Sequence, residues 1–170
     1  MKRFLLLAAI ALITIGVKAQ DDKSKRPSPP AKVTETTSKG AVITIDYSQP
    51  SVKGREIGKE IAPYGKVWRT GANEATTFEV SKNVQVEGKA LPAGKYSLFT
   101  IPNKEEWVII FNKIPEQWGA YKYAESDDVL RVKVKPGKAP QFTERMTFTV
   151  DKSGKVALLW GNEQVAFNVQ

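Results

Sequence analysis

One stretch of this sequence gathers the side chain types that bind small polar molecules. Residues 54–77 carry two arginines, a tryptophan, a tyrosine, an asparagine and three carboxylates among several glycines. An arginine offers a planar fork of N–H donors to a carboxylate, a phosphate or sugar hydroxyls, and a tryptophan offers a flat apolar face to a ring. Glycines let the backbone turn sharply and approach a ligand closely. The candidate ligand-binding residues are Arg55, Tyr64, Trp68, Arg69, Asn73 and Glu74.

The segment from Tyr64 to Thr76 is predicted to be the functional surface, and two interpretations of it stay open. In a binding interpretation, Trp68 is a stacking platform and Arg69 a donor fork, while the asparagine and the carboxylate of the segment orient the guanidinium or the ligand. In a structural interpretation, Trp68 closes the end of the domain, Arg69 pairs with Glu74, and the glycines only satisfy turns.

The residue types that are missing limit the possible chemistry. The 170 residues include no Cys and no His. This excludes disulfides, thiol nucleophiles, Cys/His zinc sites and acyl-transfer triads with an imidazole base. Acid–base catalysis would fall to carboxylates such as Glu74 or the pair Asp127 and Asp128, with an arginine stabilising an anion. The sequence places no second carboxylate beside Glu74, so a non-catalytic role is favoured, without cofactor or metal.

The net charge does not indicate a nucleic-acid partner. The formal charge is +8, but residues 41–170 hold 18 bases against 15 acids, so most of the excess lies before them. No basic helix, zinc module or RNA-binding aromatic signature accompanies that charge. We therefore expect no binding to nucleic acid.

The N-terminus is typical of a secretory signal peptide. Lys2 and Arg3 precede an apolar run over residues 4–17, and Ala19 supplies a small residue where a signal peptidase cleaves. The run is shorter than the roughly 20 residues that a helix needs to span a bilayer. We predict a signal peptide over residues 1–19 and a periplasmic or extracellular protein with no membrane span after cleavage.

The next segment, residues 20–31, is polar and rich in lysine, serine and proline. It offers little apolar surface to offset the entropy lost on ordering, so it is predicted to be a flexible leader. A single β-sandwich domain is then predicted over residues 32–170.

Strand periodicity dominates that domain. Ile43, Ile45 and Tyr47 alternate with Thr44 and Asp46, the two-residue repeat of a half-buried strand, and similar repeats follow to the C-terminus. In residues 95–101 and 106–112 both alternating sets are apolar, which predicts central strands covered on both faces.

Short turn-forming segments connect these strands. Residues 102–105, 151–154 and 161–164 each predict a hairpin connection, and hairpins make neighbouring strands antiparallel. The expected fold is all-β, an antiparallel β-sandwich or partly open barrel of about nine strands. Helix should be limited to one or two short turns, in residues 54–61 and 115–123.

Three longer motifs carry a family resemblance. They run from Pro63 to Thr76, from Leu91 to Pro102 and from Glu106 to Lys113. Together they resemble the bacterial domain-of-unknown-function 2911 family, over a region from about residue 40 to the C-terminus. The resemblance implies an exported bacterial protein, often from Bacteroidetes-like organisms, with a β-rich domain and no assigned activity. It supplies no catalytic residues.

Three function hypotheses follow for what we expect to be a monomeric soluble domain. The first two are non-catalytic: a ligand-binding module for a small polar ligand or glycan, or a domain that docks onto another envelope protein, both using the segment from Tyr64 to Thr76. The alternative is a carboxylate-dependent hydrolase that acts on a glycan or another polar envelope substrate.

Overall fold

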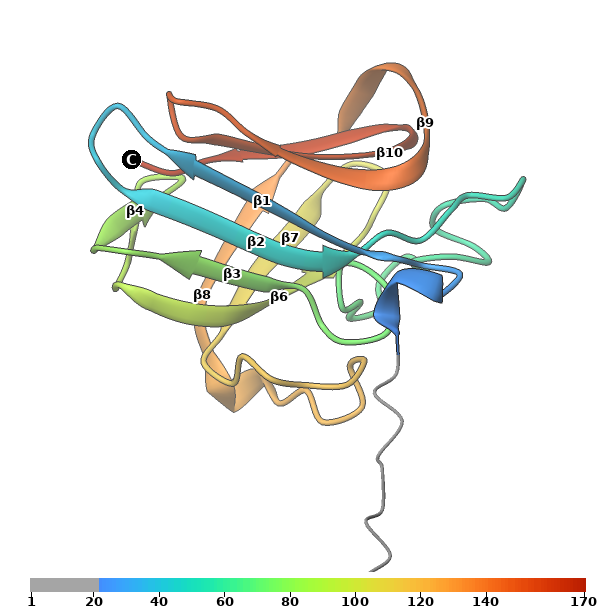
Figure 1. The fold of residues 1–170 in the computed structure, drawn as a ribbon, viewed down its shortest axis with the longest axis horizontal. Coiled ribbons are helices and arrows are strands. Elements are labelled where there is room, and N and C mark those ends of the chain that lie inside the picture. The colour runs from blue at the N-terminus through green and yellow to red at the C-terminus, as the bar shows by residue number, and fades with distance from the viewer. Residues whose placement is uncertain (1–21) are drawn as a thin grey trace, which may run out of the picture.

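The chain folds almost entirely into antiparallel strands (Figure 1). The computed structural model describes residues 22–170. Its elements are, in order, the 3₁₀ helix η1 (Lys23–Lys25), β1 (Pro30–Thr36), β2 (Val42–Ser48), β3 (Thr77–Val80), β4 (Val84–Val86), β5 (Lys89–Leu91), β6 (Gly94–Ile101), β7 (Trp107–Asn112), the 3₁₀ helix η2 (Glu125–Asp127), β8 (Asp128–Val134), β9 (Gly137–Val150) and β10 (Lys155–Asn168). The predicted all-β class is confirmed.

Two layers enclose the main core. The larger layer is a six-stranded sheet in the order β1-β2-β3-β6-β7-β8, and the long β9–β10 hairpin lies over it as a second layer (Figure 1). The small β4–β5 hairpin adds to the enclosure. Ile45 and Phe78 of the sheet, Phe148 and Trp160 of the hairpin and Leu91 of β5 are all buried in one cluster between them. The sheet stays open, with β1 and β8 as its edges, so the sandwich prediction is confirmed.

The central strands are covered on both faces, as their apolar sequences predict. Phe99 of β6 and Ile110 of β7 are fully buried on the face that does not contact the hairpin cluster. Val67, Ala120 and Tyr123 pack against them from outside the sheet. The segment between β7 and η2 therefore acts as a cover for this second face.

Asn112, at the end of β7, holds that covering segment in place. Its side chain is fully buried and makes four hydrogen bonds. Its Nδ2 donates to the Ala124 carbonyl (3.2 Å) and to Asp128 Oδ1 (2.9 Å). Its Oδ1 accepts from the Ile114 backbone N–H (3.1 Å) and from Gln117 Nε2 (3.1 Å). One amide thus ties both ends of the cover to the sheet.

One predicted hairpin is wrong. Residues 161–164 lie within β10, which continues through them to Asn168 and pairs with β9 both before and within this stretch. The register shifts between Leu159 and Gly161 and again between Gly161 and Glu163. Gly161 has φ +58°, the left-handed conformation that a bulge can use as readily as a turn does. The turn-forming residues there produce β-bulges and do not reverse the direction of the chain.

The predicted helical turns are also misplaced. Residues 54–61 and 115–123 form turns and bridges without helix, while the two 3₁₀ helices occupy residues 23–25 and 125–127. Gly54 has φ +69° and Gly58 has φ +90°, values that a right-handed helix excludes.

The described chain begins within the predicted leader, at residue 22. β1 begins at Pro30, two residues before the predicted domain, and Arg26 hydrogen-bonds to Glu74. The predicted signal peptide, residues 1–19, lies outside the described residues. Within residues 22–170, none of the helices has the length and apolar character needed to cross a membrane.

Candidate functional site

The candidate segment lies between β2 and β3, where the chain extends beyond the end of the sheet (teal to green in Figure 1). Trp68 anchors it, because its N–H donates to the Thr100 carbonyl (2.8 Å) and its carbonyl accepts the Thr100 N–H (2.9 Å). Thr76 closes the loop: its N–H donates to the Arg69 carbonyl (3.1 Å) and its Oγ1 donates to the Thr70 carbonyl (2.7 Å). The position of Arg69 is thus fixed by the sheet.

Trp68 is part of the core as well as of the candidate site. It is 8% exposed and stacks on Trp160 with ring centroids 5.3 Å apart and an interplanar angle of 10°. Trp107 stands edge-on to it at 6.3 Å. One face of the Trp68 ring is therefore already covered, and the side chain serves as a wall, not as the open platform of the binding interpretation.

Three of the six candidate residues line one cavity. Arg55, Trp68 and Arg69 meet Trp160 around a hollow of about 380 Å³. Apolar side chains such as Ile61 form much of the remaining wall, and Ser28 joins from the leader. We call this hollow the Arg69 cavity.

Arg69 gives the cavity an unpartnered cation. Its side chain is half-buried, its Nε is buried without a hydrogen-bond partner, and its guanidinium makes no ion pair within residues 22–170. Burial lowers the pKa of Arg69, and the nearby Tyr121 hydroxyl offsets this only in part. An arginine keeps its charge even so. The Arg69 guanidinium is therefore a partly desolvated cation in the cavity wall.

A second buried donor belongs to the same lining. Trp160 is 2% exposed and its Nε1 has no hydrogen-bond partner in the described part of the chain. Four buried side-chain atoms share this condition within residues 22–170, and two of them, Arg69 Nε and Trp160 Nε1, belong to residues of this cavity. Most buried polar groups are paired, so two unpaired donors on residues that line one hollow are unusual.

The charged side chains at the rim are held by backbone contacts. Arg55 donates from Nε to the Val52 carbonyl (3.1 Å) and from Nη2 to the Ser51 carbonyl (2.7 Å). Glu60, the acidic residue of the lining, accepts a hydrogen bond from the Glu56 N–H (2.9 Å). The rim is therefore pre-organised.

Backbone strain concentrates around this cavity. Five residues other than glycine have positive φ in the described chain, and four of them lie between residues 53 and 73. Ala62 (φ +46°) lines the cavity and Thr70 (φ +53°) follows Arg69. Such conformations cost roughly 1–3 kcal/mol each and gather at functional sites.

The other candidates lie elsewhere. Tyr64 packs its ring onto Gly58, where an added Cβ would lie 2.2 Å from a ring atom. Asn73 donates from Nδ2 to the Ser28 carbonyl (3.1 Å), so it holds the leader and does not orient Arg69.

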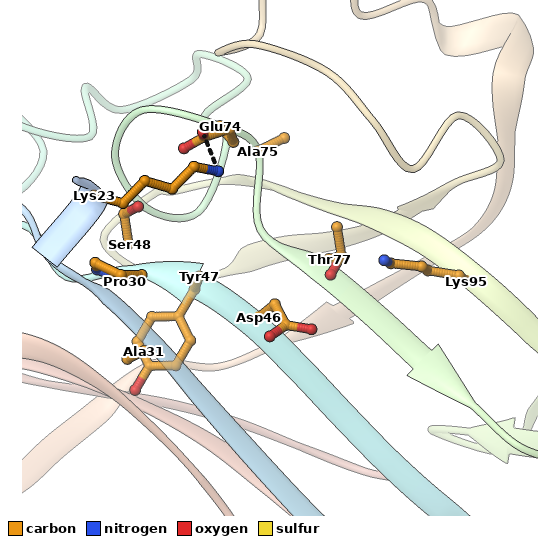
Figure 2. A pocket seen from close by; sticks show the side chains of 10 residues that line it. All are labelled: Lys23, Pro30, Ala31, Asp46, Tyr47, Ser48, Glu74, Ala75, Thr77 and Lys95. Atoms are coloured by element: carbon orange, nitrogen blue, oxygen red, sulfur yellow. Dashed lines mark ion pairs between the residues drawn. The ribbon is translucent and has the colours of Figure 1, made fainter. Parts of the chain in front are cut away.

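Glu74 pairs with the leader and not with Arg69. Lys23 Nζ and Arg26 Nη1 each lie 3.0 Å from its carboxylate, so the pairing in the structural interpretation is not the one that forms (Figure 2 draws the Lys23 contact). Burial alone would raise the pKa of Glu74, but hydrogen bonds from Lys23, its own backbone N–H and Arg26 outweigh it and bring the pKa to about 2. The carboxylate is ionised at any ordinary pH.

A family model described as a protein of unknown function, DUF2911, matches residues 28–169. The chain belongs to the DUF2911 family. The match spans β1 to β10 and confirms the resemblance carried by residues 63–113. No curated protein and no solved structure matches the chain. The DUF2911 description assigns no chemistry, so the cavity itself must indicate function.

Sequence reasoning missed three contributors to this region. Trp160 follows strand periodicity, which correctly predicts a core residue, but nothing in the pattern indicates that it also lines a cavity. Lys23 and Arg26 stand in a segment without apolar residues. Their excess positive charge was the one available sign of a carboxylate partner.

Proposed function

We propose that this DUF2911 protein is a non-catalytic binding protein for a small polar molecule that carries a carboxylate or a phosphate. The observation that supports it best is Arg69: a half-buried guanidinium with an unpaired Nε, in a cavity of about 380 Å³. Ligand sites typically measure roughly 300–1,000 Å³, so the cavity suits a molecule of the size of one sugar.

The physical reason is the cost of an unpaired donor. A buried N–H without a partner costs about 1–3 kcal/mol, and a hydrogen bond to a charged group contributes about 1.5–3 kcal/mol. An oxyanion beside Arg69 therefore removes a penalty and adds a charge-assisted bond. The largely apolar lining of the cavity suits the carbon face of a sugar ring. A sugar acid or a sugar phosphate combines both features.

Calorimetric titration tests this proposal. Glucuronate and glucose 6-phosphate should bind the wild-type protein, while glucose, which lacks the anionic group, should bind much more weakly. Arg69→Gln should weaken binding of glucuronate by about 10- to 100-fold, the equivalent of one charge-assisted hydrogen bond. Lys66→Gln, an exposed cation in the same loop, is the matched control and should bind like wild type. Equal binding of glucose and glucuronate, or full binding by Arg69→Gln, would contradict the proposal.

The chemistry of Glu74 favours binding over hydrolysis. A general acid or base works best when its pKa lies near the operating pH. Glu74 has a pKa of about 2 and is already paired with two cations. It is therefore ionised and only weakly basic, which suits an ion pair better than proton transfer.

Export is the second part of the proposal. The basic and apolar pattern of residues 1–19 supports cleavage after Ala19 and a periplasmic or extracellular location. N-terminal sequencing of the protein from fractionated cells tests it, with Gln20 expected as the first residue. Recovery of uncleaved protein in the cytoplasm would contradict export and leave the binding proposal in place.

A further inference from the structure

A second hollow, of about 380 Å³, lies between the leader and the cover of the second sheet face. Glu74, Glu116, Gln117 and Trp118 line it, with Lys23 from the leader. We call it the Glu74–Trp118 groove. It adjoins the hollow of Figure 2, because Lys23 and Glu74 line both.

The groove's own polar groups are mostly acceptors. Two are the carboxylates of Glu74 and Glu116. A third is Gln117 Oε1, which is buried without a partner. The Gln117 amide cannot simply be reversed, since its Nε2 donates to Asn112 Oδ1 (3.1 Å) and to the Ile114 carbonyl (2.9 Å). This polarity is opposite to that of the Arg69 cavity.

An indole ring completes the groove. Trp118 is 58% exposed, unusual for so large an apolar side chain, and its backbone pairs with Glu74 in an isolated bridge. The face of an indole attracts ammonium and guanidinium groups. Carboxylates and an indole face together make a site for organic cations.

The chain itself shows this recognition. Arg26 Nη1 lies 3.1 and 3.0 Å from the two carboxylate oxygens of Glu74, and its guanidinium carbon lies 5.9 Å from the centre of the Trp118 ring. Lys23 adds an ion pair at 3.0 Å. Because a 3₁₀ helix has three residues per turn, η1 places residues 23 and 26 on the same side, and Asp22 caps its first turn. The leader thus presents Lys-x-x-Arg to the groove.

We propose that the Glu74–Trp118 groove binds basic peptide segments of a partner protein, and that the leader is its intramolecular occupant. The effective concentration of a tethered segment is on the order of millimolar. To displace the leader, a partner peptide must therefore bind the groove more tightly than the leader segment does. The groove leaves a carboxylate for such a partner, because Glu116 makes no ion pair within residues 22–170. A partner with a further donor engages a group that the leader leaves unused.

The test adds a peptide to full-length secreted protein. The probe is the synthetic heptapeptide of residues 23–29, Lys-Ser-Lys-Arg-Pro-Ser-Pro, and tryptophan fluorescence reports its binding because Trp118 is exposed. The double variant Lys23→Ala, Arg26→Ala frees the groove and should bind the peptide at least about tenfold more tightly than wild type. Lys25→Ala, an exposed leader cation that pairs with Asp22 and not with the groove, should behave like wild type.

Three further measurements complete the design. Adding Glu74→Gln to the double variant should abolish peptide binding, and a peptide with glutamine in place of its lysines and arginine should not bind. Arg69→Gln should leave peptide binding unchanged, so failure here is separable from failure of the ligand proposal. The inference is overturned if the double variant does not bind the peptide, if it binds no more tightly than wild type, or if Glu74→Gln has no effect.

Discussion

Replacing Arg69 with methionine is expected to stabilise the fold while it removes ligand binding. The guanidinium is half-buried and its Nε has no partner in the described chain, a penalty of about 1–3 kcal/mol. Methionine keeps most of the apolar stem and removes the unpaired donor. We therefore expect the free energy of unfolding to rise by about 1–2 kcal/mol. For a chain of this size that corresponds to an increase in Tm of about 2–8 °C.

Urea and thermal unfolding followed by circular dichroism measure this change, with Arg131→Met as the matched control. Arg131 has partners: its Nε donates to Asp128 Oδ2 at 2.7 Å, and its Nη1 pairs with Glu125 at 2.9 Å. The Asp128 side chain is 6% exposed, so loss of this partner should cost about 2–3 kcal/mol. If Arg69→Met destabilises the protein as much as Arg131→Met does, then Arg69 is a structural residue and the reasoning fails.

Three other predictions concern the fold and its dependence on pH. Asn112→Ala removes four hydrogen bonds of a fully buried amide and should cost about 3–5 kcal/mol in urea unfolding; a loss below about 1 kcal/mol would show that the cover is held by other contacts. Gly154→Ala should cost more than Gly65→Ala, because both have positive φ but a Cβ at Gly154 would lie 1.9 Å from the Val169 carbonyl oxygen and one at Gly65 meets nothing within 4 Å; equal thermal stability of the two variants would refute this. The pKa of Glu74 falls from 4.5 to about 2 on folding, so its stabilisation is complete above the unfolded value and is lost as the pH falls from 4.5 towards 2. Glu74→Gln should flatten that slope in unfolding curves measured across this range, and an unchanged slope would assign it to other carboxylates.

Periodicity predicts most of the strands because it reflects which face of each strand is buried. Ile43 and Ile45 are fully buried on alternate positions of β2, as the alternation with threonine and aspartate predicts. Phe99 and Ile110 break the alternation because the segment between β7 and η2 covers their face of the sheet. The hairpin prediction at residues 161–164 was wrong because the same residue types form turns and bulges, and only pairing with β9 decides between them.

The candidate site was predictable in composition but not in geometry. An arginine and a tryptophan among glycines single out Arg69 and Trp68, and the structure places both on the wall of one cavity. That Trp68 stacks on Trp160, and that Glu74 pairs with Arg26, depend on contacts between segments far apart in the chain. No local pattern encodes such contacts. The folded structure was therefore needed to assign Trp68 to the cavity wall, Arg69 to the unpaired donor and Glu74 to the contact with the leader.

The central claim, that Arg69 receives an anionic ligand, is tested most directly by nuclear magnetic resonance of its Nε–H group. Titration with sodium glucuronate should shift this resonance saturably, while the same concentrations of glucose and of sodium chloride should leave it in place. A resonance that does not move with glucuronate, or that moves equally with sodium chloride, would contradict the account.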